Sequence, residues 1–505
     1  MSGIANNAIL NTSIRSFGAI ANLLTQLTAL AVLSRLLPIE AFGAVTYSML
    51  LVGFAEMICQ FGVGQALVQA PKISQTEVRT ALAITITTAC VAILAVLACS
   101  VLLNLEEQYQ HLMRALSLVC LASSSYVISL ALLQREHRFL EITIADSCSY
   151  FISYVVVGIG LAVLGAGVWS LVASILTHAF LRAALLWSRT RHSLLPRFSR
   201  MASGPLMRFG STLTAARIVN YGAQCSDGLM TGFFLGNYSL GIYSRSMQLI
   251  KLPFQLIVSS VHSVLFPLLA RVEDVATIRK TYYRATMFML CLMTSYGCVL
   301  FLIAPDLIEM LFGPAWKESA PLLQILAPVS VFSVYSLGDA VLKATNHVRL
   351  QVCAHTCFFL SLSLSSLIGA MWLGVSGVAT AVLISYTLVY LGILAACRYS
   401  LMGTWYEVWR IHVPPLCMGV AIIGSGAAVR TMFVNFFNAN GPILCLAVTA
   451  ICTMVFLFVS TVPTIRVLTE YRHLFLQNVG VVTEGLRTTT VQMRNSILET
   501  EESRV

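Results

Sequence analysis

The feature that most constrains this chain is the recurrence of apolar runs about 20 residues long, the length that a helix needs to cross a bilayer. Only 10% of the 505 residues are charged and 58% are hydrophobic, whereas soluble domains carry about 25% charged residues. The runs predict an all-α polytopic membrane protein with about 14 transmembrane helices. We place the spans at residues 17–36, 42–62, 80–103, 112–134, 144–164, 168–187, 209–234, 243–268, 284–304, 320–342, 354–374, 377–397, 412–430 and 442–462.

The positions of Lys and Arg predict how these helices are oriented. Most of the 31 Lys and Arg residues fall in the N-terminus, the even-numbered loops and the tail, and cytoplasmic loops are enriched in such residues. Few fall in the odd-numbered loops, namely Arg35, Arg114, Lys317 and Arg430. We therefore predict that both termini are cytoplasmic. Because this bias explains the net charge of +10, nucleic acid is not an expected partner.

The 14 cysteines lie almost entirely within apolar runs, which predicts small packing residues and no disulfide framework. The densest cluster, Cys353, His355 and Cys357, has no second ligand pair elsewhere in the sequence. We expect the start of a membrane helix there, and neither a metal site nor a bound cofactor. No loop is long enough to hold a soluble domain, so the activity must be built from the helices, and we do not expect an enzyme.

Comparing the chain with itself at an offset of 198 residues reveals an internal repeat. The identities are Ser13 with Ser211, Asn22 with Asn220, Gln26 with Gln224, Gly43 with Gly241, Ser48 with Ser246, and Met49 with Met247. Six spans separate the two copies, so they share one orientation and predict two pseudo-symmetric six-helix lobes with a substrate site between them. The expected organisation is an N-lobe (1–187), a basic cytoplasmic connection (188–207), a C-lobe (208–397), two further helices (398–463) and a cytoplasmic tail (464–505).

Each lobe carries a polar stripe on its first helix, if successive residues are turned by about 100°. The stripes are Asn11, Arg15, Asn22 and Gln26 in the first span, and Arg217, Asn220, Gln224 and Asp227 in the seventh. Arginine offers phosphate two parallel hydrogen bonds and stays ionised when partly desolvated. Arg15 and Arg217 are therefore candidate ligands of a diphosphate, with Lys251 as a third, and the amides of the stripes can hydrogen-bond sugar hydroxyls.

Two alternatives compete with these assignments. The Asn and Gln residues can simply join helices through hydrogen bonds, and Arg15 can snorkel to the cytoplasmic interface. Arg217, Arg245 and Lys251 lie within or at the edge of spans, where an unpaired charge costs several kcal/mol and so indicates function.

Two carboxylates inside predicted spans, Glu56 and Asp227, are candidates for coupling transport to a gradient of H⁺ or Na⁺. For Asp227 a buried ion pair with Arg217 or Lys251 is an equal alternative.

The segment from Asn220 to Arg271 resembles the polysaccharide transporter branch of the multidrug/oligosaccharidyl-lipid/polysaccharide exporter superfamily. The matching positions are Asn220, Asp227, Gly232, Leu235, Gly236, Leu240, Gly241, Tyr243, Phe266 and Pro267. The N-terminal part matches through Arg35, Leu37, Pro38, Phe42, Gly43, Gly62, Ala66, Leu67 and Gln69. The chain departs from the family at Gln60, where relatives often carry an acid, and has Glu56 one turn earlier.

The resemblance implies a Wzx-type flippase with a MATE- or MurJ-like fold, in which two lobes open alternately around a cationic cavity. Such proteins move undecaprenyl-diphosphate-linked oligosaccharide repeat units from the cytoplasmic to the periplasmic leaflet of the bacterial inner membrane. Exopolysaccharide, capsule and O-antigen lipopolysaccharide units all remain open as the cargo. The implied partners are the polyprenyl-diphosphate-linked oligosaccharide and membrane lipid, followed by a polysaccharide polymerase and export machinery.

Three other functions compete with a flippase. A MATE-like cation or drug antiporter would share the architecture, but its substrates favour an acidic cavity, whereas the candidates here are basic. A membrane polysaccharide polymerase or glycosyltransferase usually needs a large external loop with catalytic carboxylates or arginines, and the odd-numbered loops are short. A structural scaffold for a synthesis complex has no sequence feature in its favour.

Overall fold

The structure, a computed structural model, describes residues 22–70, 73–102, 107–136, 138–193, 195–269 and 274–437. Arg15, the predicted span at 442–462 and the whole predicted tail (464–505) lie outside these ranges. Residues 22–36 form a helix. The elements that follow in the first half are α2 (Ile39–Gln60), α3 (Val63–Gln69), α4 (Gln75–Leu102), α5 (Glu107–Ser117), α6 (Val119–Arg135), α7 (Phe139–Tyr150), the π-helix η1 (Phe151–Gly158), α8 (Ile159–Val163) and α9 (Val168–Thr190).

The second half of the described chain is also helical and contains two very long elements. The elements are α10 (Arg200–Leu269), α11 (Val275–Phe312), the short 3₁₀ turn η2 (Pro314–Trp316), α12 (Ser319–Leu326), α13 (Val329–Phe332), α14 (Tyr335–Ala344), α15 (Val348–Ser400) and α16 (Trp405–Phe437). The two longest helices are each bent at a glycine, Gly236 in α10 with φ 78° and Gly374 in α15 with φ 63°. Only glycine adopts such positive φ values without strain.

Gly236 lies between two predicted spans and Gly374 is the last residue of the predicted span 354–374, so α10 and α15 are each a pair of helices joined by a tight turn. Within the described ranges, nine helical segments are long and apolar enough to cross a membrane, with α15 counted once. The chain is therefore an all-α, multi-pass membrane protein, as predicted. The total of 14 helices stays a prediction.

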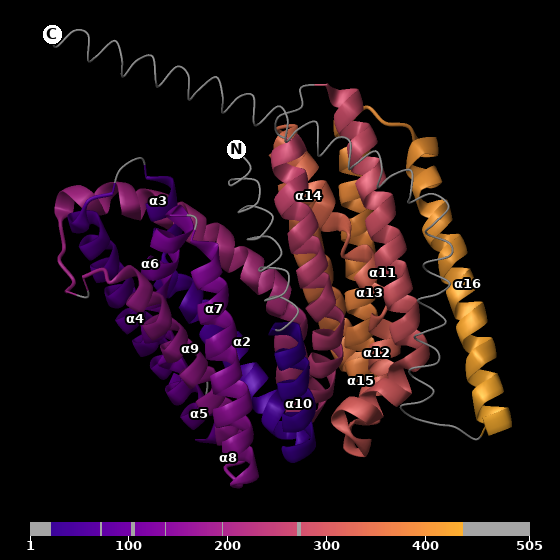
Figure 1. Cartoon of the computed structure of the whole chain (residues 1–505), viewed down its shortest axis with the longest axis horizontal. Coiled ribbons are helices and arrows are strands. Elements are labelled where there is room, and N and C mark those ends of the chain that lie inside the picture. The colour runs from indigo at the N-terminus through magenta and orange to yellow at the C-terminus, as the bar shows by residue number, and fades with distance from the viewer. Residues whose placement is uncertain are drawn as a thin grey trace, which may run out of the picture.

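The helices form two groups that lean apart at one end of the molecule and approach each other at the opposite end (Figure 1). The first group contains α3 to α9, and the second contains α11 to α16. Helix α10 connects the groups: its first half runs along α2, and its second half packs within the second group. The groups lean apart at the upper end of Figure 1 and approach each other at its lower end.

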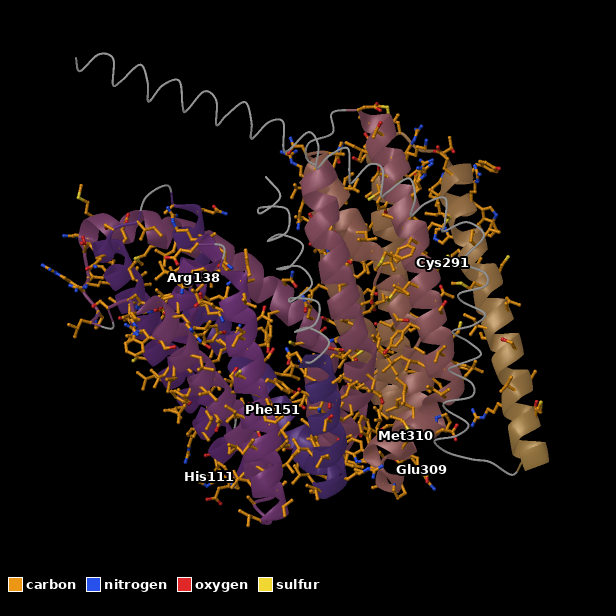
Figure 2. All side chains as sticks on the ribbon, in the orientation of Figure 1. His111, Arg138, Phe151, Cys291, Glu309 and Met310 are labelled. Carbon is orange, nitrogen blue, oxygen red and sulfur yellow. The ribbon has the colours of Figure 1, made fainter. Side chains whose placement is uncertain are left out.

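The loops alternate between the two ends of the molecule, as a multi-pass topology requires. Figure 2 places Arg138, from a predicted cytoplasmic loop, near one end, and His111, Glu309 and Met310, from predicted periplasmic loops, near the other. The end at which the groups meet is therefore the predicted periplasmic end.

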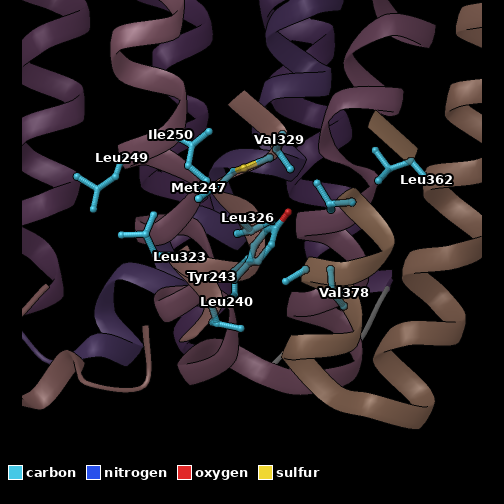
Figure 3. Packing of buried hydrophobic residues seen from close by; sticks show 14 of the residues in the cluster. Leu240, Tyr243, Met247, Leu249, Ile250, Leu323, Leu326, Val329, Leu362 and Val378 are labelled. Carbon is cyan, nitrogen blue, oxygen red and sulfur yellow. The ribbon is translucent and has the colours of Figure 1, made fainter. Parts of the chain in front are cut away.

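The second half of α10 is anchored in the core of the second group (Figure 3). Leu240, Tyr243 and Met247 are buried there in one apolar cluster with Leu323 and Leu326 of α12. Close van der Waals packing of this kind is what holds helices together in lipid, where apolar surface gains little from leaving water. The packing fixes the face of α10 that carries these residues, and leaves the neighbouring Arg245 to the opposite side.

Candidate functional site

The two lobes meet along α2 and the first half of α10, where two repeat-related glycines lie close to the backbone of the other lobe. A Cβ added to Gly43 would lie 1.8 Å from the carbonyl oxygen of Asn237, and one added to Gly241 would lie 2.5 Å from that of Ile39. Residues 39 and 237 differ by the repeat offset, as do Gly43 and Gly241. The two contacts are therefore equivalent under the internal repeat, and the pseudo-symmetry axis of the lobes passes between them.

Polar and aromatic contacts close the same end of the molecule across the lobes. Arg35 donates from Nε to the carbonyl of Leu311 at 3.2 Å, and from Nη2 to the carbonyl of Met310. These carbonyls end α11, where a cation is favourable. Trp316 donates from Nε1 to the carbonyl of Ser34 at 2.9 Å, and its ring lies 5.5 Å from that of Phe42. We call these contacts, with the glycine pair, the seal.

A cavity of about 310 Å³ lies against the seal, between the helix at 22–36, α2, α7, η1, α9 and α10. Its lining is mainly apolar, with a few polar groups. The polar lining residues are Thr46, Tyr150, Tyr154, Tyr221, Arg245 and Gln248. None of the residues lining this cavity is acidic, and its charged residue is Arg245.

Arg245 is held in the cavity wall with part of its hydrogen-bonding capacity free. Its Cζ lies 4.3 Å from the centre of the Phe42 ring, and Nη1 donates to Oε1 of Gln248. Its Nε is buried and finds no hydrogen-bond partner among the described residues. A buried donor without a partner costs about 1–3 kcal/mol, and a guanidinium on an aromatic face remains able to bind an anion with its planar fork. The site therefore suits an anionic group such as a phosphate.

Two stacked tyrosines form another wall of the cavity. The rings of Tyr150 and Tyr154 lie 4.4 Å apart with an angle of 18° between their planes, and His178 meets Tyr150 edge-on at 5.7 Å. Both tyrosines are partly buried, and neither hydroxyl has a partner within the described part of the chain. Tyr154 belongs to η1. π-Helical turns are rare in proteins, and those that occur are frequently found at functional sites.

Arg217, predicted as a diphosphate ligand, belongs to a hydrogen-bond network with the predicted ion site at Glu56, and its binding of a diphosphate stays a prediction. Arg217 donates from Nη1 to Oε1 of Gln60 at 3.4 Å, and Gln60 donates from Nε2 to Oε1 of Glu56 at 3.3 Å. The same Glu56 oxygen accepts from Ser123 at 2.7 Å and from Tyr126 at 3.2 Å. Gln60 thus bridges an intramembrane acid and base, and Arg217 does not line the cavity described above.

Asp227, the other predicted ion site, is buried, and it accepts a hydrogen bond from the hydroxyl of Tyr243. No ion pair joins Asp227 to Arg217 or Lys251 in the described structure, and Lys251 is partly buried. Coupling of either carboxylate to an ion gradient stays a prediction.

The predicted sugar-binding amides do not line the cavity either. Gln224 donates from Nε2 to Oδ1 of Asn220 at 2.5 Å, and both side chains are exposed. Asn22 and Gln26 are partly buried, and Oδ1 of Asn22 has no partner among the described residues. The structure brings together the two amides of the seventh span, and a role in sugar binding stays a prediction for all four.

His355, from the densest Cys/His cluster of the sequence, lies 3.1 Å from both carboxylate oxygens of Asp339 through Nε2. In the described ranges no group of three or more potential metal ligands comes together.

Sequence reasoning recognised Arg245 as an unusual charge but gave it no role, and it missed Gln248, Tyr150 and Tyr154. One signal was present in the internal repeat. Arg245 lies directly before two repeat identities, Ser246 and Met247, yet its counterpart in the first copy is Tyr47. When one copy of a repeat has a charged residue within a membrane span and the other copy has an uncharged one, the difference indicates a function that only one lobe performs.

The sequence profile of a family described as polysaccharide biosynthesis protein matches residues 32–321. The lipopolysaccharide biosynthesis protein WzxC of Escherichia coli (strain K12) is 25% identical over 325 residues, which cover 62% of this chain and 65% of that protein. The succinoglycan biosynthesis transport protein ExoT of Rhizobium meliloti (strain 1021) is 27% identical, covering 61% of this chain and 64% of its own length. The match thus spans just under two thirds of either relative.

Among solved structures, the chain is similar to the lipid II flippase MurJ in an inward closed conformation. The TM-score is 0.68 at 15% identity, and the match covers 92% of this chain and all of that one. At this identity the likeness shows the fold, which is the MurJ-like architecture of two lobes predicted from the repeat.

Proposed function

We propose, since the chain belongs to the polysaccharide biosynthesis protein family, that it is a flippase for undecaprenyl-diphosphate-linked oligosaccharide repeat units. It moves them from the cytoplasmic to the periplasmic leaflet of the bacterial inner membrane, and its lobes open alternately to the two sides. The observation that carries the proposal is the cavity at the junction of the lobes, whose charged lining residue is Arg245.

The chemistry of the cavity fits the head group of such a lipid. A diphosphate needs a cation that stays charged away from water, and arginine meets this requirement. Thr46 and Gln248 add groups that can hydrogen-bond phosphate oxygens, and the two tyrosines add groups that can hydrogen-bond sugar hydroxyls. A long polyprenyl chain needs no protein site because it can remain in the lipid.

The conformation fits the first step of the transport cycle. Contacts between the lobes at Arg35, Trp316 and the glycine pair close the predicted periplasmic end, and the lobes lean apart at the other end (Figure 1). Lipid-linked units are assembled on the cytoplasmic side, so this state is suited to receive them. Breaking the seal while the lobes close at the cytoplasmic end would then expose the head group to the periplasm.

The alternatives are less compatible with this cavity. An antiporter for cationic drugs would place Arg245 against a substrate of like charge, and the cavity lining offers no acidic residue to compensate. A polymerase would need catalytic carboxylates or arginines on an external loop, and the described segments between helices at the predicted periplasmic end are short.

The first test replaces Arg245 by Gln in cells that depend on the chain for polysaccharide synthesis. We expect the fraction of lipid-linked repeat units accessible to membrane-impermeant periodate in spheroplasts to fall about tenfold or more, because a charged hydrogen bond contributes about 1.5–3 kcal/mol. The Arg245→Lys variant keeps the charge without the fork and should lose part of the activity.

Arg114→Gln is the matched control, since Arg114 is exposed and bonds only Gln110 in the described structure. All variants are compared at equal membrane abundance. Translocation by Arg245→Gln at the rate of Arg114→Gln would refute the proposed site.

A further inference from the structure

We propose that Tyr150 and Tyr154 form a platform on which the first sugar of the lipid-linked unit stacks, while Arg245 holds the diphosphate beside it. This inference rests on the proposed function and adds which wall of the cavity meets which part of the head group. The tyrosines are then specificity-determining residues.

The two rings form a face-to-face stack, so each ring covers one face of the other and an outer face of the stack is what a ligand can meet. The two rings are nearly parallel at 4.4 Å and line the same cavity as Arg245. Their hydroxyls have no partner among the described residues, although the side chains are partly buried. Buried tyrosine hydroxyls usually find a hydrogen-bond partner, so these two are available to a ligand.

A sugar ring is the ligand class that matches such a surface. A pyranose has faces of C–H groups and a rim of hydroxyls, and tyrosine has an apolar ring with a polar tip. A neutral sugar is also compatible with the nearby arginine, whereas a cationic ligand on the same rings would be repelled by it. The cavity, at about 310 Å³, is at the lower end of the range of about 300–1,000 Å³ for ligand pockets. It has room for a diphosphate with a small number of sugar rings.

The local backbone separates the platform from the lipid-facing side of the same element. Tyr154 lines the cavity, whereas Phe151, the first residue of η1, is 50% exposed and does not line it. Figure 2 labels Phe151 on this helix. Tyr154 and Phe151 therefore give a matched comparison. Both are aromatic residues of η1, but Tyr154 belongs to the platform and Phe151 does not.

The experiment measures binding of two probes to the purified full-length protein in detergent by isothermal titration calorimetry. The probes are farnesyl diphosphate and farnesyl-diphosphate-linked glucose, so the ratio of their dissociation constants reports the contribution of the sugar. We expect the glucose to increase the affinity of the wild type. Tyr150→Leu and Tyr154→Leu should each reduce this ratio about three- to tenfold, as expected for the loss of one aromatic contact.

Three further comparisons make the result decisive. Binding of farnesyl diphosphate by the Leu variants should be unchanged, which also shows that they are folded. Tyr154→Phe should keep most of the sugar contribution, and Phe151→Leu all of it. If the ratio survives in both Leu variants, the platform is refuted while the proposed function stands. If neither probe binds the wild type, or Arg245→Gln binds farnesyl diphosphate as well as the wild type, the diphosphate site itself is wrong and the platform falls with it.

Discussion

In the described structure Arg245 pairs with no carboxylate, unlike two other arginines of the membrane helices. Arg182 pairs with Asp146 at 2.6 Å, and Arg430 with Asp306 at 3.4 Å. Nε of Arg245 lacks a partner in the described structure. The sequence could identify Arg217 and Arg245 as costly charges, but it could not rank them, because the partner that satisfies Arg217 comes from α2 across the lobe junction.

Glu56 gives a prediction at the same scale. One of its oxygens accepts from Ser123, Tyr126 and Gln60, so Glu56→Ala removes the acceptor of the Ser123 and Tyr126 hydroxyls. We expect Glu56→Ala to unfold at a lower temperature in detergent, because its free energy of unfolding falls by about 1–3 kcal/mol. Glu56→Gln keeps an acceptor, so its unfolding temperature should stay close to that of the wild type. Glu107→Ala, at an exposed carboxylate, is the control. Normal stability combined with loss of transport in Glu56→Gln would instead identify a titrating ion site.

At the scale of elements, α2 and α10 owe their close approach to small residues at repeat-related positions. Gly43 and Gly241 were visible in the sequence as a repeated pair, and the repeat correctly predicted two lobes. It did not predict that the two glycines sit against each other's helices, because this depends on how the lobes pack. The π-helical turn of η1 was likewise hidden, since its residues read as an ordinary apolar span.

The glycine pair of the seal predicts equal effects of substitution at its two equivalent positions. Gly43→Val and Gly241→Val each force a side chain against a backbone carbonyl of the other lobe, and overpacking costs about 1–3 kcal/mol. Scanning fluorimetry of the purified variants should show both unfolding at lower temperature. Gly160→Val is the control, because a Cβ there meets nothing within 4 Å. If Gly43→Val and Gly241→Val are both as stable as Gly160→Val, the two lobes do not close through this pair.

At the scale of the whole molecule, the apolar runs were sufficient to predict the helical membrane fold, because each helix satisfies its own backbone and its position follows from composition. The site was harder to predict. Its cavity joins Phe42, Tyr154 and Arg245, which lie far apart in the sequence and in ordinary apolar spans. The central claim is that these parts together move an anionic glycolipid between leaflets.

The most direct test reconstitutes the purified chain in liposomes with a fluorescent farnesyl-diphosphate-linked disaccharide and follows its transfer between leaflets by quenching with dithionite. The same disaccharide on uncharged farnesol is the comparison. We predict rapid transfer of the diphosphate lipid only in the presence of the protein. The wild-type protein should transfer the uncharged lipid much more slowly, and the Arg245→Gln variant should transfer the diphosphate lipid much more slowly than the wild type does. Transfer of the diphosphate lipid no faster than in protein-free liposomes, or equal transfer of both lipids, would contradict the account.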